Sequence, residues 1–176
     1  MLEPDAMLEP QADPERRKMV LVSQIIVAAL FAGCLFFLLI VLLIVPGKLG
    51  SWDLGLGKPM TSAALVMAFG ILAARIIVPG VVTGQMLRQL AQQDPKEPDW
   101  GDLFGVYQAT LIIKAALLEG AVFFLLVAHM IERSPWTLAL AVVFLLMVLM
   151  HMPTPFRVDD WIEQQSLVVK GQRLMP

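Results

Sequence analysis

The sequence predicts an all-α integral membrane protein, a four-helix antiparallel transmembrane bundle with a C-terminal interfacial amphipathic helix. Of its 176 residues, 58% are hydrophobic and only 16% are charged, a composition that soluble domains rarely show. Four apolar runs are separated by polar, turn-rich segments, and each is close to the roughly 20 residues that cross a bilayer. We therefore predict spans at about 19–45, 60–82, 109–131 and 135–152.

The chain opens with a polar segment. Residues 1–18 are acidic and rich in proline, a composition that predicts a disordered tail. The basic residues 16–18 then precede the first apolar run. This run, 19–45, is too long for a signal peptide and lacks a small-residue cleavage site, so it predicts a membrane anchor. Ala29 and Gly33 form a small-xxx-small pair in it, which favours close helix packing.

The second span follows a loop, residues 46–59, that is rich in glycine and proline. The apolar run covers 60–82, and we expect its helix to continue to Gln93. Gly80 and Gly84 form a GxxxG pattern in the second half of this helix. The pattern has two interpretations, a dimer contact or a hinge near the membrane interface.

Arg75 lies inside this second span. Helical spacing places it on one face with the small residues Ala64 and Ala68, which predicts that the face packs against protein. Pro79 removes the amide that would bond to the carbonyl of Arg75, so we predict a helix kink at this point. A guanidinium and an unpaired carbonyl would then lie close together in the membrane.

Glu119 lies near the middle of the third span, 109–131. At ~1.5 Å per residue its depth is ~15 Å, close to the midplane of the bilayer. A charged carboxylate at that depth costs at least a few kcal/mol, so it must be neutral, paired or beside water. Ala116 and Gly120 form a small-residue pair on the face of Glu119. We therefore expect this face to contact another helix.

Arg75 and Glu119 come to a similar depth if the second and third spans are antiparallel neighbours. We predict that the two side chains form an intramembrane salt bridge, a structural clamp that sets the register of the helices. Intramembrane ionisable groups also mark ion or proton paths, which is the alternative. In a third interpretation they do not touch, and Arg75 snorkels to the interface, as we expect of Lys114 in the third span.

Turn signals delimit the remaining elements. Asp102 is placed to cap the third helix. The turn at 132–136 is so short that the third and fourth spans must form a hairpin, and Pro153 ends the fourth. The tail, 153–176, is predicted to be an amphipathic helix at the interface. Its apolar side contains Val158, Trp161, Ile162, Val168 and Val169.

The distribution of basic residues predicts the orientation, because Lys and Arg are enriched on the cytoplasmic side. Of the thirteen, eight fall on the side of the two termini and three on the other, with Arg75 and Lys114 inside spans. We therefore predict a multi-pass protein of the cell (inner) membrane with cytoplasmic N and C termini. The eight are Arg16, Arg17, Lys18, Arg88, Lys96, Arg157, Lys170 and Arg173.

No set of residues indicates catalysis, and we expect neither a cofactor nor a metal. The net charge of −2 and the lack of a basic patch argue against nucleic acid as a partner. The single cysteine, Cys34, is expected to be a packing residue. His151, with Met147, Met150 and Met152 close by, fits Cu(I) as an alternative. Methionine as apolar filler is the simpler interpretation.

The sequence resembles known membrane proteins in two respects. The segment AALLEGAVFFLLVA, residues 115–128, resembles the ion-binding helix of proteolipid (c-type) subunits of rotary ATPases. That family's glycine-repeat partner helix is absent, and Arg75 on a neighbouring span would be foreign to its ring, so the family's function is not carried over. The overall plan is also similar to small uncharacterised four-span bacterial membrane proteins with a mid-membrane glutamate, a resemblance that implies no activity.

The function that these features favour is a non-enzymatic one. We expect an accessory or scaffold subunit of a membrane assembly, whose partners are the lipid bilayer and other membrane proteins or a second copy. The alternative is an oligomeric proton or ion conductor that uses Glu119.

Overall fold

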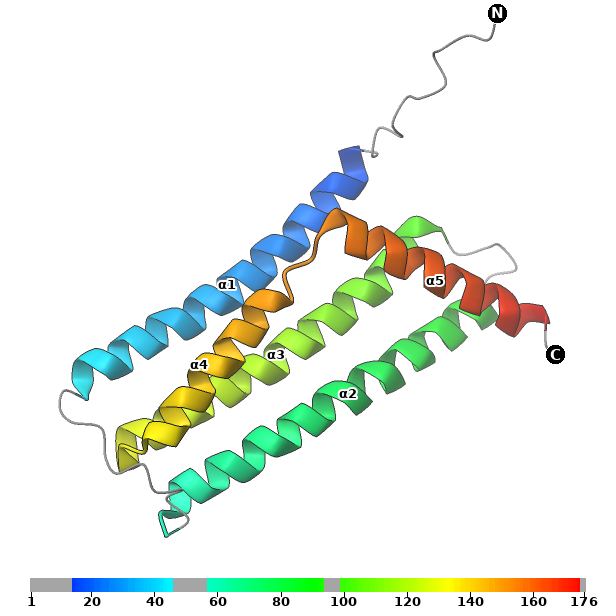
Figure 1. The fold of residues 1–176 in the computed structure, drawn as a ribbon. Helices are drawn as coiled ribbons and strands as arrows, with labels where there is room; N and C mark the ends of the chain where they lie inside the picture. Colours follow the sequence, from blue (N-terminus) through cyan, green and yellow to red (C-terminus); the bar gives the residue numbers. More distant parts are fainter. Residues whose placement is uncertain (1–13, 46–56, 94–98, 175–176) are drawn as a thin grey trace, which may run out of the picture.

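The structure, a computed structural model, describes residues 14–45, 57–93 and 99–174, and this part of the chain is helical throughout, with no strand (Figure 1). Each helix follows one of the apolar or amphipathic runs and ends where proline, glycine or charged residues interrupt it. The five helices are α1 (Pro14–Ile44), α2 (Pro59–Gln93), α3 (Trp100–Glu132), α4 (Pro135–Met150) and α5 (Pro155–Leu174).

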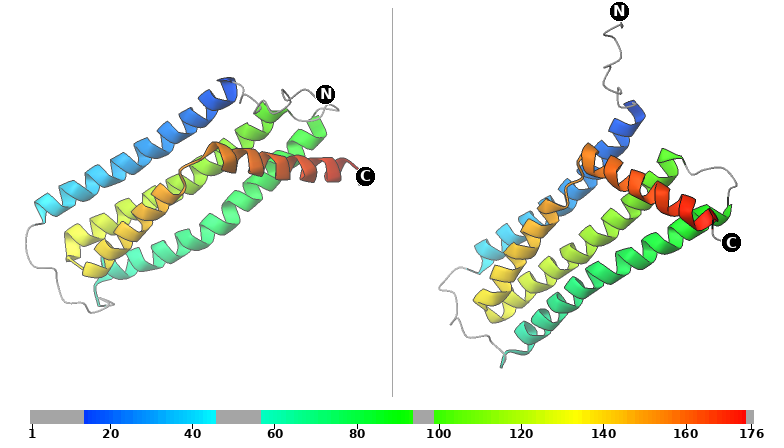
Figure 2. Two further views of the ribbon diagram at one scale, coloured as in Figure 1. Left: turned by 45° about the horizontal axis from the view of Figure 1, so that its top comes forward. Right: turned by 45° about the vertical axis from the view of Figure 1, so that its right-hand side comes forward.

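Helices α1 to α4 lie side by side, and α3 is the central one. It packs against each of the other four helices, whereas α1 and α2 make no contact within the described residues. The views agree that α3 lies between α1 and α2 (Figures 1 and 2). The start of α1, the end of α2 and the start of α3 lie at one end of the bundle, together with α5. We call this the α5 end.

The main core lies where α3 meets its neighbours. Its largest fully buried side chains include Phe144 of α4, Leu118 and Leu126 of α3, and Val27 of α1. Ala64 and Ala68 of α2 are 1% and 4% exposed and belong to the same cluster. Their small side chains let α2 approach α3 closely, which aligns the side chains of the two helices.

The first helix begins earlier than the sequence predicts. We expected disorder through residue 18, but α1 begins at Pro14. Proline at the first helical position has its φ angle already set for a helix, and Glu15 in the first turn complements the helix dipole. The rest of the predicted disordered tail, residues 1–13, and loop residues 46–56 lie outside the described part of the chain.

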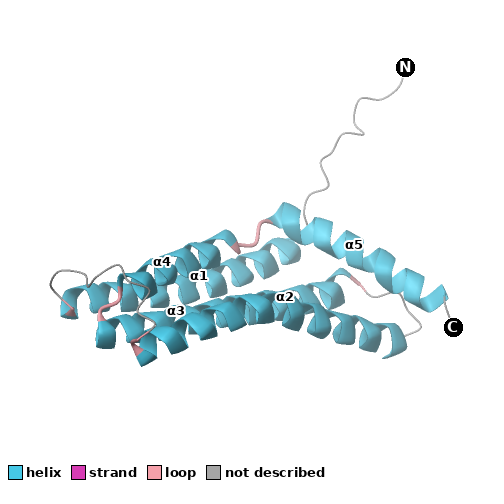
Figure 3. Ribbon diagram, turned by 60° about the horizontal axis from the view of Figure 1, so that its bottom comes forward, coloured by secondary structure: helices cyan, strands magenta, loops and turns pink. Residues whose placement is uncertain are grey.

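Three of the helices, α1, α2 and α3, are long and apolar enough to cross a membrane. Helix α4 has 16 residues, about 24 Å at 1.5 Å per residue, and is shorter than the hydrocarbon core. It joins α5 across a bend of 74°, so the count becomes four only if this bent pair is one span (Figure 3). The predicted fourth span at 135–152 is thus shorter than the others.

Helix α5 turns its apolar side toward the protein. Val158, Ile162 and Val169 are buried in a second cluster with residues of α1, α2 and α3, among them Leu87 and Leu103. The apolar stripe predicted for an interfacial helix is thus largely covered by the bundle. Val168, predicted on the same stripe, is 45% exposed. Helix α5 therefore covers the ends of α2 and α3 (Figure 1).

Carboxylates cap two of the helices. Asp99 is the N-cap of α3, and its side chain accepts a hydrogen bond from the amide of Asp102. The side chain of Asp102 accepts a hydrogen bond from the amide of Asp99 in return. Asp102 is therefore the third residue of a capping box and not the cap itself. At the opposite end, Glu132 of α3 accepts from the amides of Met60 and Thr61 at 2.9 and 2.6 Å and so caps α2.

Candidate functional site

Two contacts set the register of α2 against α3. Glu132 binds the first turn of α2, and the hydroxyls of Thr83 and Thr110 lie 2.9 Å apart nearer the α5 end. Counting between these two points places Arg75 level with about Leu118 on the antiparallel helix. Arg75 and Glu119 are therefore at nearly the same height in the bundle, as predicted from the lengths of the two runs.

Arg75 nevertheless binds a different partner. Its Nη2 lies 2.6 Å from Nε2 of His151, at the end of α4. The Nδ1 atom of His151 lies 2.5 Å from the carbonyl oxygen of Met147 and must donate to it, because a carbonyl only accepts. In the neutral ring Nε2 is then unprotonated and accepts from the guanidinium. The predicted Arg75–Glu119 pair is replaced in this structure by an Arg75–His151 hydrogen bond.

Glu119 faces α1. Phe123, one turn further along α3, packs its ring 5.1 Å from that of Phe37 in α1, and Glu119 lies close enough to Cys34 of α1 to interact with it electrostatically. The carboxyl group is partly exposed. Among the residues that the structure describes, no hydrogen bond or ion pair engages it. A polar group of the third span is therefore left without a partner in the part of the chain that the structure describes.

The position of α3 explains why the predicted pair does not form. The depth of two residues follows from their places along each helix, but the directions of their side chains depend on where the helix neighbours lie. Arg75 belongs to α2 and reaches toward the end of α4, whereas Glu119 points from α3 toward α1. Helix α3 separates α1 from α2 (Figure 2). The two side chains therefore extend toward different neighbours.

The small-residue pairs also differ in their surroundings. Ala64 and Ala68 are buried, but the other predicted packing residues are exposed or half-buried. A Cβ atom added at any of their glycines would meet no atom within 4 Å, so no neighbouring helix of this chain approaches them. These residues, predicted to pack against a helix, are Ala29, Gly33, Gly80, Gly84, Ala116 and Gly120.

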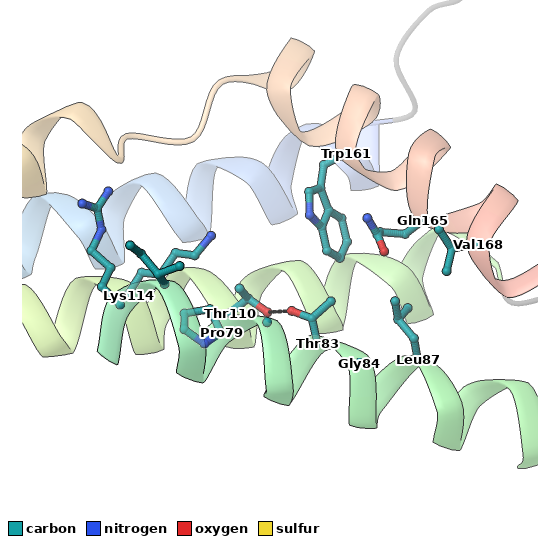
Figure 4. A pocket seen from close by; sticks show the side chains of 12 residues that line it. Pro79, Thr83, Gly84, Leu87, Thr110, Lys114, Trp161, Gln165 and Val168 are labelled. Atoms are coloured by element: carbon teal, nitrogen blue, oxygen red, sulfur yellow. Dashed lines mark hydrogen bonds between the residues drawn. The ribbon is translucent and has the colours of Figure 1, made fainter. Parts of the chain in front are cut away.

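Helix α2 continues as one helix through Pro79. The side chain of Pro79 is buried and lines a cavity of about 490 Å³ between α2, α3 and α5. Trp161 and Gln165 reach into the cavity from α5, opposite the hydrogen-bonded pair Thr83 and Thr110 (Figure 4). The full lining is Arg75, Ile76, Pro79, Gly80, Thr83, Gly84, Leu87, Thr110, Lys114, Trp161, Gln165 and Val168.

A second cavity, of about 170 Å³, shares a wall with the first. Thr110, Lys114 and Trp161 line both of them. The second cavity adds His151 and a further cation, Arg157. Its full lining is Tyr107, Thr110, Leu111, Lys114, Met150, His151, Met152, Arg157 and Trp161.

The two cavities bring positive charges together without a negative one. Arg75, Lys114 and Arg157 all act electrostatically on His151, and Arg75 also acts on Lys114. Within the described ranges, no carboxylate lines either cavity. Arg157 donates to the carbonyl oxygen of Met150 at 3.3 Å. For Lys114, by contrast, no hydrogen bond or ion pair occurs within the described ranges. The site is therefore suited to bind an anion.

Sequence reasoning missed this basic site, although a signal was present. Arg75 and Lys114 are the two cations inside spans, and each falls in the half of its predicted span, 60–82 or 109–131, that is nearer the α5 end. Snorkelling would have moved each to the interface separately, but the fold turns both into one cavity. His151, considered only as a copper ligand, has both ring nitrogens engaged. In the described part of the chain, no three His, Cys, Asp or Glu residues are grouped to hold a metal.

Comparisons with protein-family models, curated proteins and solved structures give no match for this chain. The interpretation of its sites therefore depends on their own geometry and chemistry.

Proposed function

We propose that this protein is a non-enzymatic accessory or scaffold subunit of a membrane assembly, and that Glu119 lies at its contact with a partner. The observation that supports this is the carboxyl of Glu119, which has no hydrogen-bond or ion-pair partner among the described residues and lies beside the exposed pair Ala116 and Gly120. A polar group left in hydrocarbon costs several kcal/mol. A helix from another subunit would remove that cost.

The surface around Glu119 restricts the chemistry of the partner. Exposed small residues let a second backbone approach closely, and Ile112 beside them is 37% exposed and offers an apolar contact. The partner is therefore a transmembrane helix with small residues of its own and a hydrogen-bond donor at mid-membrane depth. Such a donor, a hydroxyl, amide or basic group, would satisfy the carboxyl of Glu119.

The proposed topology has four spans, with α4 completed by the bend into α5, and both termini in the cytoplasm of a cell with an inner membrane. The excess of basic residues at the α5 end supports this orientation. Trp100 and Trp161 at the same end form part of an aromatic belt, since tryptophan is enriched at membrane interfaces.

The test is native mass spectrometry of the full chain extracted gently from its own membrane. We expect the wild type to carry a second, different subunit, and Gly120→Leu to lose it, because a bulky side chain would occupy the contact. Gly70→Leu is the matched control. Gly70 is also exposed in a helix, and a Cβ atom at either glycine meets no atom within 4 Å. Neither change should therefore unfold the chain.

Two results would contradict the assembly role. One is recovery of the wild type alone from every mild detergent. The other is equal release of the subunit by Gly70→Leu and Gly120→Leu. If the wild type is recovered as a closed ring of identical copies, the surface around Glu119 serves self-association and the accessory role is wrong.

The unpaired carboxyl also favours a second candidate, an oligomeric proton or ion conductor. A carboxyl without a cationic partner can exchange a proton or an ion, whereas one held in a salt bridge cannot do so readily. Proton flux into liposomes separates the two candidates. Conduction requires Glu119→Gln to abolish flux while the assembly stays intact, and the accessory role predicts no flux in the wild type.

A further inference from the structure

Positive charge gathers in the two adjoining cavities at the α5 end. Arg75 and Lys114 line the larger cavity, and Lys114 and Arg157 line the smaller one. Arg75 acts electrostatically on Lys114, and all three cations act on His151. Among the described residues, no carboxylate lines either cavity. Like charges gathered in a site of low dielectric constant repel strongly unless an anion compensates them.

The site contains several hydrogen-bond donors, and only some of them have acceptors among the described residues. Arg75 donates one of its five N–H groups to His151 and retains the others. Thr83 and Thr110 share one hydrogen bond, which uses the hydrogen of only one of the two hydroxyls. Lys114 has three donors and, in the part of the chain that the structure describes, no acceptor for any of them.

His151 fixes the position of the guanidinium. Its Nδ1 donates to the carbonyl of Met147, so its Nε2 accepts from Arg75 and holds the planar group at the cavity wall. A neutral acceptor orients the arginine without cancelling its charge. A carboxylate in the same place, such as the predicted Glu119, would have neutralised the site.

We propose that the two cavities form a binding site for a phosphate group, held by Arg75 and Lys114 with Thr83 or Thr110 as a hydroxyl donor. Guanidinium groups and lysines are the common phosphate ligands of proteins, because a phosphate offers several charged acceptor oxygens to their N–H groups. Arg157, at the far wall of the smaller cavity, adds to the positive potential. The site is independent of the assembly surface at Glu119.

The phosphate has two chemical sources, an anionic phospholipid headgroup or a free phosphate ion. The rim favours the lipid, because Ile76 and Val168 line the larger cavity and are 80% and 45% exposed. Their apolar side chains can contact acyl chains while the cations hold the headgroup. Basic pockets between transmembrane helices on the cytoplasmic side are a known setting for lipid headgroups.

The experiment uses the full chain in phosphatidylcholine nanodiscs. One arm adds phosphatidylglycerol and measures bound lipid by native mass spectrometry, and the other adds inorganic phosphate and measures Tm. We compare wild type with Lys114→Met and with the control Arg88→Met, an exposed cation of α2 that lines neither cavity. Lys114→Met should weaken binding by about tenfold or more, since a charge-assisted hydrogen bond is lost. Arg88→Met should bind like the wild type.

The same variant also reports on folding. Because Lys114 has no hydrogen-bond or ion-pair partner among the described residues and is repelled by Arg75, Lys114→Met should have a Tm equal to or above that of the wild type without ligand. Bound phosphatidylglycerol, with a Tm that inorganic phosphate does not change, would assign the site to a lipid headgroup. A rise in Tm with inorganic phosphate would assign it to the free ion. The proposal is overturned if the wild type binds neither, or if Lys114→Met binds as well as Arg88→Met.

Discussion

Arg75 and Glu119 illustrate how one polar residue can be stabilised inside the chain while another is not. The guanidinium of Arg75 has a neutral acceptor, His151 Nε2, at 2.6 Å. The carboxyl of Glu119 has no partner within the described residues. A polar group with a hydrogen-bond partner inside the chain contributes to the stability of the isolated chain. A polar group without such a partner contributes only when another molecule binds it.

The first prediction compares these two residues in the isolated protein. His151→Phe should lower the free energy of unfolding in detergent by about 1.5–3 kcal/mol, because it leaves a guanidinium without its acceptor. Glu119→Gln should change it by less than about 0.5 kcal/mol, as expected where no contact is lost. Thermal unfolding of the purified chain measures both.

A double-mutant cycle with Arg75→Met checks that the effect belongs to the pair. The loss from His151→Phe should largely disappear when Arg75 has already been replaced. A structural clamp between Arg75 and Glu119 would give the reverse order, a large loss for Glu119→Gln and a small one for His151→Phe.

Among the helices, α5 differs most from its predicted role, because its apolar side packs against the bundle. Three of its apolar side chains, Val158, Ile162 and Val169, are buried against the ends of the long helices. Trp161 packs edge-on against Tyr107 of α3 at 5.4 Å and also lines both basic cavities. The same helix therefore completes a second hydrophobic core and closes the candidate anion site.

The second prediction tests the docking of α5. Ile162→Ala should destabilise this core by about 2–5 kcal/mol, because a buried isoleucine is reduced to a methyl group. The helix should then detach more often and become easier to cleave by trypsin after Arg157 or Lys170. Limited proteolysis in nanodiscs measures this rate.

Leu167→Ala is the matched control, because Leu167 lies on the same helix and is 66% exposed. Its cleavage rate should equal that of the wild type. If both variants were cleaved at the wild-type rate, the packing of Ile162 would not hold α5 in place.

For the whole molecule, the question that matters is how the bundle is oriented in the membrane. The excess of basic residues at the α5 end predicts that this end lies in the cytoplasm. Cys34, the single cysteine, is fully buried in the core, so it leaves the surface available for cysteine labelling.

The third prediction uses two single-cysteine additions, Arg133→Cys at the turn between α3 and α4 and Leu167→Cys on α5. A membrane-impermeant maleimide should label Arg133→Cys in intact cells and Leu167→Cys only after permeabilisation. The unmodified chain is the control, and its buried Cys34 should not react in either condition. The opposite labelling pattern would invert the proposed topology.

The sequence by itself determined the helical class of the protein, the approximate helices and the position of each polar group along its helix. These properties depend on local chemistry, because apolar length decides which segments can cross a bilayer and turn residues decide where they end. Arg75 and Glu119 were accordingly predicted at matching heights. The start of α1 differs from the predicted boundary. The helix begins at Pro14, before the apolar run, because a proline at the first position and a glutamate in the first turn favour a helix there.

Only the tertiary structure decided which polar groups meet. Neighbour relations between helices, and the rotation of each helix about its axis, depend on packing across the whole bundle, which no segment encodes alone. With α3 between α1 and α2, Glu119 faces one neighbour while Arg75 reaches His151 at the end of α4. The same packing gathers Lys114 and Arg157 around Trp161, because α5 folds back across the bundle after the bend that follows α4.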